Sequence, residues 1–374
     1  MNQDLAPTYQ CQFGEFWLLW YSKSNNYSIV EHEFKSLLDH YLNANSIDTF
    51  NSLIIEEDIV SDTAEIVKSL ELYLENCNAT NKAYTTPKLK FDSSKSHIQA
   101  YYHFLDKTIE INYDSNLVKK IIHPAIAYLE VSKKTKVQTV FDIYLDEDLL
   151  CLFKDKELVT AVPKRDYHLL QGKFVMQLLS IVHGKQESDW LGTFHGSTIS
   201  DSKNSIVFIG QSGKGKSTLC AILSSHGFEL VADDVSPVLS KKGHIYYNPS
   251  AISIKEGAFN TLKPIVDHFD TIPTVLFNKT KGQLKYIPRD IPTLYSYPCK
   301  AIIKVNYDKD ADTTLEDLSV KELLETLIPD SWISSEPHHA KQFLDWLKSI
   351  YFYKLTYSDT ESVIKKITTV FKSF

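Results

Sequence analysis

The chain has 374 residues, of which 43% are hydrophobic and 23% charged, a composition typical of globular rather than disordered proteins. Its formal net charge of −7 argues against a general nucleic-acid binder, which needs a basic face to neutralise phosphates. No apolar run approaches the ~20 residues of a membrane span, and no secretory signal is visible at the start. We therefore expect a cytoplasmic protein that binds neither nucleic acid nor membrane.

Three residue types are informative, and two of them, arginine and glycine, are unusually scarce. The five cysteines are scattered and lack CxxC spacing, which favours reduced thiols over a disulfide framework or a zinc site. Only Arg165 and Arg289 can supply a guanidinium group, beside 38 lysines. Six of the 12 glycines lie between Gly192 and Gly227, which indicates a segment that needs backbone freedom or close approach.

Residues 1–95 are predicted to form a small helical, winged-helix-like module. Helices are expected at Glu33–Leu42 and Asp62–Asn76, and Phe16–Tyr21 is expected to be a core strand. The spacing resembles the winged-helix peptide-recognition modules of ribosomal-peptide modifying enzymes, although a domain that only packs on the rest of the chain would give the same pattern. The polar stretch Asn76–Ser96 marks the predicted boundary.

Residues 96–190 are predicted to form an α+β region that packs on the third part of the chain. Short β-type runs, Val137–Tyr144 and Leu149–Phe153, flank an acidic turn, and a helix is expected at Phe174–Val182.

Residues 191–374 are predicted to form the main α/β domain. Strand and helix signals alternate to about residue 300, as in a mixed or parallel sheet. The C-terminal part is expected to contain a strand at Tyr351–Tyr357 and three helices. Two of the helices open with capping boxes, and the expected bounds and boxes are Val320–Leu327 with Ser319 and Glu322, His338–Ile350, and Glu361–Phe371 with Ser358 and Glu361.

This third part contains a phosphate-binding motif. The sequence from Gly210 to Ser217 fits G-x-x-x-x-G-K-[ST] at every position. In such a loop the glycines let backbone N–H groups converge on phosphate oxygens, Lys216 reaches the β- and γ-phosphates, and the Ser217 hydroxyl ligates Mg²⁺. The predicted nucleotide-binding residues are Gly210, Gln211, Ser212, Gly213, Lys214, Gly215, Lys216, Ser217 and Thr218.

The flanking elements fit the same interpretation. A buried strand is expected at Ile206–Ile209 and a helix at Lys216–His226, with Gly227 as its C′ residue. The N-terminus of that helix would then direct its partial positive charge at the phosphates.

Two adjacent carboxylates end the next predicted strand, Phe228–Val231. Asp233 lies seventeen residues after Lys216, and Asp234 follows it. One carboxylate beside a phosphate loop is enough to ligate Mg²⁺, so the other is free to accept a proton from an acceptor hydroxyl. The spacing leaves open which of the two would ligate Mg²⁺ and which would accept the proton. In isolation such a pair would be read as a turn.

With the upstream Phe194-His195-Gly196, these segments resemble the HPr kinase/phosphorylase family, which shares a nucleotide-binding core with PEP carboxykinases. The resemblance covers about residues 190–300 well and the rest of the C-terminal part loosely. It implies an α/β fold with a P-loop core, ATP and Mg²⁺ as cofactors, and a homo-oligomer, because HPr kinases assemble as hexamers. It also implies functional roles for His195, Lys216, Ser217, Asp233 and Asp234. Asp234 would be the proton acceptor, Asp233 would ligate the metal with Ser217, and His195 would be an acid–base or phosphate-orienting group.

The chain departs from the family after the aspartate pair. Where the family has a Glu-Ile-Arg-Gly-type segment, Asn248–Gly257 contains no arginine, and Lys255 and Glu256 are interpreted as solvated charges. Arg289 remains as a candidate charge clamp on the transferring phosphoryl group. The departure puts the phosphorylase reaction and HPr as substrate in doubt.

We therefore expect an ATP-dependent, Mg²⁺-requiring kinase for a hydroxyl group, either a serine of a peptide or protein or a small hydroxylated metabolite. The alternative from another class is a nucleotide-binding regulatory protein or an ATPase without a phosphoryl acceptor.

Overall fold

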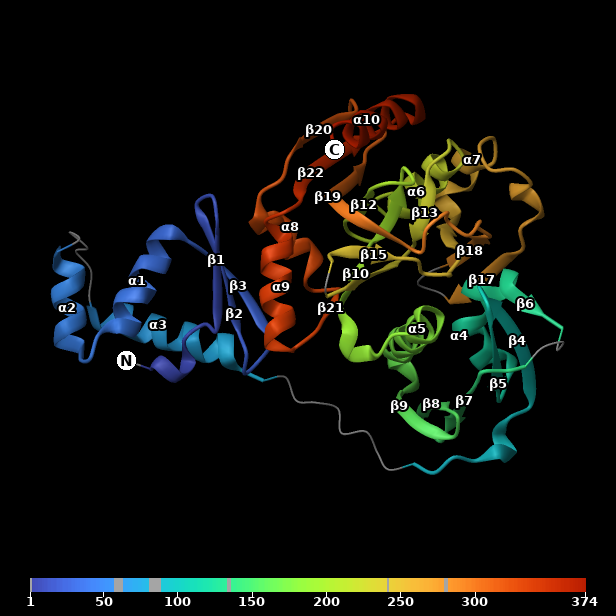
Figure 1. Cartoon of the computed structure of the whole chain (residues 1–374), viewed down its shortest axis with the longest axis horizontal. Helices are drawn as coiled ribbons and strands as arrows, with labels where there is room; N and C mark the ends of the chain where they lie inside the picture. The colour runs from blue at the N-terminus through green and yellow to red at the C-terminus, as the bar shows by residue number, and fades with distance from the viewer. Residues whose placement is uncertain (1, 57–62, 81–88, 133–135, 241, 279–281) are drawn as a thin grey trace.

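The part of the chain that the structure describes contains four β-sheets with flanking helices and has a mixed α/β fold (Figure 1). The structure is a computed structural model and describes residues 2–56, 63–80, 89–132, 136–240, 242–278 and 282–374. Residues 81–88 of the predicted linker and the expected helix start at Asp62 lie outside these ranges.

The first sheet is an antiparallel meander followed by three helices. Its strands are β1 (Tyr9–Phe13), β2 (Phe16–Tyr21) and β3 (Asn26–Glu31). The helices are α1 (His32–Asn43), α2 (Ile47–Glu56) and α3 (Thr63–Asn78). The last four residues of β2 are buried, so this apolar run is core strand, as predicted.

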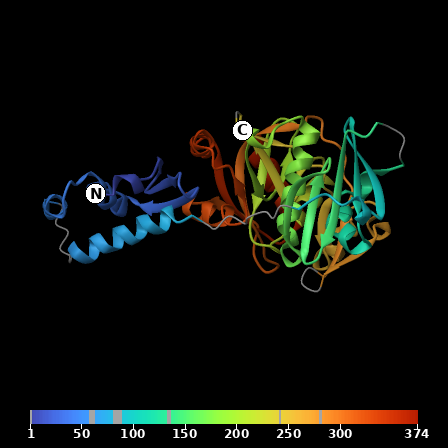
Figure 2. The same cartoon turned by 90° about the horizontal axis from the view of Figure 1, so that it is seen from below.

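This N-terminal unit lies against helix α9 (Pro337–Leu347) at one end of the molecule (Figures 1 and 2). The rings of Tyr27 and Phe343 meet edge to face, 5.4 Å between centroids, and the Asn25 side-chain amide donates to the carbonyl of Ile333 at 2.9 Å. Cys11 and Leu18 belong to the same apolar cluster as residues of α9. The N-terminal unit therefore packs against the C-terminal part of the chain through α9 and the residues beside it.

A six-stranded sheet of order β6-β4-β5-β7-β8-β9 follows. Its strands are β4 (Ile98–Phe104), β5 (Lys107–Tyr113), β6 (Glu130–Val131), β7 (Thr139–Asp146), β8 (Leu149–Lys154) and β9 (Glu157–Pro163). Its helices are α4 (Asn116–Ile126) and α5 (Tyr167–His183). Both helices contribute to one apolar cluster with this sheet, and α5 begins seven residues before the predicted helix because apolar positions such as Leu170 extend it backwards.

The main sheet runs in the order β13-β11-β12-β19-β15-β14-β10-β21, with β22 beside β19 and β20 beside β22. The strands are β10 (Trp190–His195), β11 (Ser197–Ser200), β12 (Ser205–Ile209), β13 (Glu229–Ala232), β14 (Val235–Leu239), β15 (His244–Tyr246), β19 (Ser296–Tyr307), β20 (Thr314–Asp317), β21 (Trp332–Ile333) and β22 (Tyr351–Tyr357). A smaller sheet contains β16 (Ile252–Lys255), β17 (Thr274–Asn278) and β18 (Gly282–Ile287), beside the short helix α7 (Phe259–Leu262).

Helices cover both faces of the main sheet. Val207 and Ile209 of β12 face α9 and α8 (Val320–Leu327), whereas Ile206 and Phe208 face α6 (Lys216–Ser224) and α10 (Thr360–Lys372). Because successive side chains of a strand point to opposite faces, a strand buried on both sides is apolar throughout. The central strands β12, β19 and β22 are parallel and their neighbours antiparallel, which makes the sheet mixed, as predicted.

Three predicted helix ends can be compared with the structure. Ser319 caps α8 by accepting from the N–H of Glu322, but the Glu322 carboxylate binds Lys304 and does not complete the box. The predicted cap Ser358 is wrong: Asp359 caps α10 by accepting from the N–H of Ser362 at 2.8 Å, since a carboxylate one residue closer reaches the first turn.

Helix α6 ends two residues earlier than predicted, and its stop is the one expected. Gly227 has φ +91°, and the N–H groups of Gly227 and Phe228 donate to the carbonyls of Ser224 and Leu223. This pair of hydrogen bonds around a left-handed glycine is a Schellman motif.

Candidate active site

The glycine-rich loop connects β12 to α6 and packs on the ends of β19 and β22. Gly210 has φ +143°, and a Cβ there would lie 2.8 Å from the carbonyl oxygen of Val305. Gly215 has φ +94°, and its carbonyl accepts a hydrogen bond from the Tyr357 hydroxyl at 3.2 Å. Both positions therefore require glycine, for backbone conformation and for space.

The middle of the loop faces outward. Gln211 to Lys214 are exposed, and a Cβ on Gly213, whose φ is +87°, would meet no atom within 4 Å. The carbonyl of Lys214 accepts from the N–H of Tyr307, which ties the loop to β19. The loop is thus anchored at its ends and open at its centre, where a phosphate chain would approach.

Lys216 and Ser217 begin helix α6 directly behind the loop. The Lys216 ammonium is buried and donates to the carbonyls of Gly210 and Gln211 at 2.5 and 3.3 Å. Burial lowers the pKa of Lys216, although Asp234 and Asp233 act in the opposite direction. Thr218 follows in the first turn of α6 and is half-buried.

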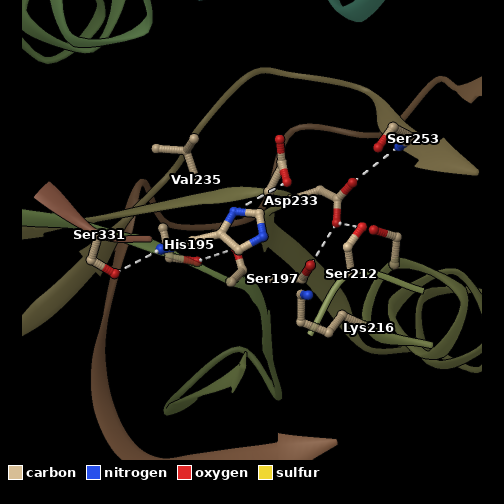
Figure 3. Close-up of polar contacts among 12 residues, drawn as sticks. His195, Ser197, Ser212, Lys216, Asp233, Val235, Ser253 and Ser331 are labelled. Carbon is tan, nitrogen blue, oxygen red and sulfur yellow. Dashed lines mark hydrogen bonds and ion pairs between the residues drawn. The ribbon is translucent and has the colours of Figure 1, made fainter. Parts of the chain in front are cut away.

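Asp233 is the buried carboxylate of the site, 1% exposed. Its Oδ1 accepts from the hydroxyls of Ser197 and Ser217 at 2.6 and 2.9 Å, and its Oδ2 accepts from the N–H of Ser253 at 3.0 Å (Figure 3). Burial and then the nearby Asp234 raise its pKa, against the effect of these hydrogen bonds. The sequence analysis did not assign Ser197 or Ser253 to the site, although Ser197 directly follows Phe194-His195-Gly196 and Ser253 lies within Asn248–Gly257.

Asp234 lies in a tight turn between β13 and β14. Its φ is +64°, and the N–H of Val235 donates across it to the carbonyl of Asp233 at 2.8 Å, the i→i+2 bond of a γ-turn. The side chain is 63% exposed, and its Oδ1 lies 3.4 Å from Nδ1 of His195. The left-handed backbone at this position thus combines with an exposed carboxylate that lies beside His195.

His195 ends β10, and its backbone N–H donates to the Ser331 hydroxyl at 3.1 Å (Figure 3). The following Gly196 permits this arrangement, because a Cβ there would lie 2.7 Å from the carbonyl oxygen of Phe208. The predicted His-Gly pair therefore combines a half-exposed imidazole with a position that has no room for a side chain.

Two basic residues are placed differently from the predictions. Lys255 is exposed, but its ammonium donates to the Ser212 hydroxyl at 2.8 Å, so it is a loop contact and more than a solvated charge. Arg289 donates to the carbonyls of Leu230 and Val231 at 2.7 and 3.1 Å, with its guanidinium carbon 4.5 Å from the Tyr247 ring centroid. In the described structure its side chain therefore contacts the backbone of β13 and the Tyr247 ring, and not the loop. Burial lowers the pKa of Arg289, and Asp233 opposes this effect less than Tyr247 does.

The second arginine and the cysteines lie outside the loop contacts described above. Arg165 is exposed and pairs with Asp166, and all five cysteines are buried and free. No helix within the described ranges is long and apolar enough to cross a membrane.

The donors at the loop fit Mg²⁺. Ser217 and Asp233 present hard oxygen atoms that share one hydrogen bond, and Asp233 has no lysine or arginine as an ion-pair partner among the described residues. Mg²⁺ bound with nucleotides takes one or two such protein ligands, with phosphates and water completing its shell. A cluster of three or more metal-binding His, Cys, Asp or Glu side chains is absent from the part of the chain that the structure describes.

Comparisons with known proteins give a weak likeness among solved structures. No family model matches the chain, and no curated protein matches it. Among solved structures, the chain resembles the Hpr(Ser) kinase/phosphatase from Coxiella burnetii, with 15% identity and a TM-score of 0.22, over 48% of this chain and 94% of that chain. The likeness is weak and concerns the fold alone.

Proposed function

We propose that the protein is an ATP-dependent, Mg²⁺-requiring kinase that transfers the γ-phosphoryl group to a hydroxyl, most simply that of a serine in a peptide or protein. The observation that carries the proposal is that two carboxylates with different surroundings lie side by side next to the glycine-rich loop. The Ser217–Asp233 pair lies at the start of α6, and Asp234 and His195 form a second, exposed pair next to it. A buried carboxylate for metal beside an exposed one for proton transfer is the division of roles that phosphoryl transfer requires.

The residues have distinct roles in this proposal. The N–H groups of the loop, with Lys216 and Lys255, hold the phosphates. Ser217 and Asp233 would hold Mg²⁺, which neutralises charge on the phosphate oxygens. Asp234 accepts the proton of the acceptor hydroxyl. His195 orients the Asp234 carboxylate, since its Nδ1 lies 3.4 Å from Oδ1 of Asp234.

Single-turnover assays with γ-labelled ATP test this proposal. Label is expected on a peptide or on a small hydroxylated metabolite incubated with the protein. Label released only as inorganic phosphate would contradict a kinase and favour an ATPase or a nucleotide-dependent regulator.

The variant Lys216→Ala tests whether the loop binds the phosphates of the nucleotide. Because the lysine contacts the phosphates in the proposal, both nucleotide affinity and turnover are expected to fall by about tenfold or more. Unchanged nucleotide affinity, measured by calorimetric titration, would contradict phosphate binding by this loop.

A further inference from the structure

A cavity of about 330 Å³ opens beside the Asp234–His195 pair. One wall is helix α5, which contributes Leu169, Gly172 and Met176, and the other is the edge of the main sheet formed by β10 and β21. Figure 1 shows α5 below these two strands. Because α5 is in the region 96–190, this cavity brings a second part of the chain to the candidate active site.

The cavity is apolar inside and continues onto the surface. Met176 and Phe194 are buried in its lining. Leu169 and Trp332 line it as well and remain 39% and 37% exposed. Exposed apolar side chains next to a cavity mark a binding surface. Because these two continue the apolar lining to the outside, the site fits a ligand that is longer than the cavity.

The charges in the lining disfavour an anionic ligand. Its carboxylates are Glu187, Asp234 and Asp330, and its one lysine, Lys173, already pairs with Glu187 at 3.0 Å. A sugar phosphate or an acidic peptide would meet like charges there without a free lysine or arginine among the lining residues.

Gly172 leaves the cavity open. It lies inside helix α5, where glycine is less favourable than alanine by about 1 kcal/mol. A Cβ at Gly172 would meet no atom within 4 Å, so packing does not explain the glycine. The position instead keeps side-chain volume out of a cavity that it lines.

We infer that this cavity is the acceptor site. The acceptor is a peptide segment in which the serine or threonine that receives the phosphoryl group has an apolar or aromatic neighbour. The inference rests on the proposed kinase function and adds the place and class of its acceptor. The acceptor oxygen forms a bond to the γ-phosphorus of ATP while the bond from that phosphorus to the β–γ bridging oxygen breaks. ADP leaves with the bonding electron pair, and the hydroxyl proton passes to Asp234.

Side chains of increasing size at Gly172 test the site. The probes are short synthetic peptides with one serine, flanked by leucine or phenylalanine in one set and by glutamate in another, together with glycerol and glucose. For the wild type, kcat/KM is expected to be highest with the apolar-flanked peptides. Gly172→Trp should lower that value by about 100-fold, and Gly172→Ala, which adds a single methyl group to the cavity, should lower it by a smaller factor.

Nucleotide affinity separates this inference from the proposed function. ATP binding should change by less than about twofold in both Gly172 variants, because the loop is not altered. Thermal unfolding checks that Gly172→Trp is folded, and the exposed Leu169→Glu is a second variant expected to reduce use of the apolar-flanked peptides by about tenfold.

Three results would overturn the inference. If Gly172→Trp and Leu169→Glu both transfer label as well as the wild type, the acceptor binds elsewhere although the kinase function stands. If glutamate-flanked peptides, glycerol or glucose are the better acceptors, the class of acceptor is wrong. If the wild type labels none of the probes and releases only inorganic phosphate, the proposed function fails together with this inference.

Discussion

At the scale of single residues, Asp234 combines exposure with backbone strain. A φ of +64° is unfavourable for most residues, and aspartate and asparagine adopt it more readily than others. Its carbonyl accepts from the N–H of Gly196 at 3.2 Å, so the turn is also tied to the residue between β10 and β11. Such a backbone conformation costs of order 1–3 kcal/mol for most residues, and the surrounding hydrogen bonds maintain it here.

The first prediction concerns Asp234→Asn. Asparagine tolerates the left-handed backbone but cannot accept the proton, so phosphoryl transfer should fall by about 10²–10⁴-fold while nucleotide affinity changes little. Rapid-quench transfer assays and nucleotide titrations measure the two quantities. Near-normal turnover of this variant would exclude Asp234 as proton acceptor.

At the scale of elements, the loop is shaped by the strands beneath it. Gly210 and Gly213 both have positive φ, but only Gly210 faces a backbone atom, the carbonyl oxygen of Val305. Similarly, helix α5 ends at His183, whose Nε2 lies 2.7 Å from the carbonyl oxygen of Tyr247. Both contacts join an element to a segment far from it in sequence.

The second prediction compares Gly210→Ala with Gly213→Ala. Gly213→Ala should cost only the conformational term of about 1–2 kcal/mol. Gly210→Ala should cost more, about 3 kcal/mol or above, because its Cβ also displaces β19. Urea unfolding measures both variants, and equal losses would show that contact with Val305 does not restrict position 210.

The third prediction is a pH dependence of stability that arises from His183. Burial lowers the pKa of His183 to about 4, from an ordinary value of 6.5. Between these values the unfolded chain binds a proton that the folded protein does not, so the free energy of unfolding should fall as the pH falls from 6.5 to about 4, by up to about 3 kcal/mol.

Urea midpoints over that pH range measure the effect. In His183→Gln the amide can still donate to Tyr247 but does not titrate, so this part of the pH dependence should disappear. His168→Gln, at an exposed position of the same helix, is the control and should leave it in place. An unchanged pH profile in His183→Gln would contradict the assignment.

At the scale of the whole molecule, the ring of Tyr27 is one of several contacts that hold the N-terminal unit to the rest of the chain. The Tyr27 ring packs on Phe343, which in turn lies 5.9 Å from Phe194 of β10, measured between ring centroids. The hydroxyl of Tyr27 is buried and has no hydrogen-bond partner among the described residues. The contact therefore depends on the ring and not on its polar atom.

The fourth prediction follows from this difference. Tyr27→Ala should destabilise the protein by about 3–5 kcal/mol, because it removes a large packed side chain. Tyr27→Phe should be neutral or slightly stabilising, since it deletes an unsatisfied buried group. Chemical unfolding, with hydrogen exchange in β3 and α9, measures both variants, and a loss of equal size in the two would contradict the role of the ring.

Much of the fold and of the candidate site could be predicted because the signals are local. The loop from Gly210 to Ser217 is a run of eight residues whose conformations depend on glycine and on the adjoining helix. The Schellman stop at Gly227 and the strand at Tyr351–Tyr357 are likewise local in origin and were predicted. The cap at Asp359 was predicted one residue too early because neighbouring Ser and Asp are both good N-caps, and only backbone geometry selects between them.

The sequence by itself determined the loop, its helix and the aspartate pair that follows, together with the scarcity of arginine that limited any guanidinium to two positions. Only the tertiary structure decided where distant side chains go. It directs Arg289 to the backbone of β13, places Lys255 on Ser212, and sets helix α5 beside β10 to form the cavity at Asp234. These placements depend on how strands pair and helices cover the sheet, which is a property of long-range packing that no local spacing encodes.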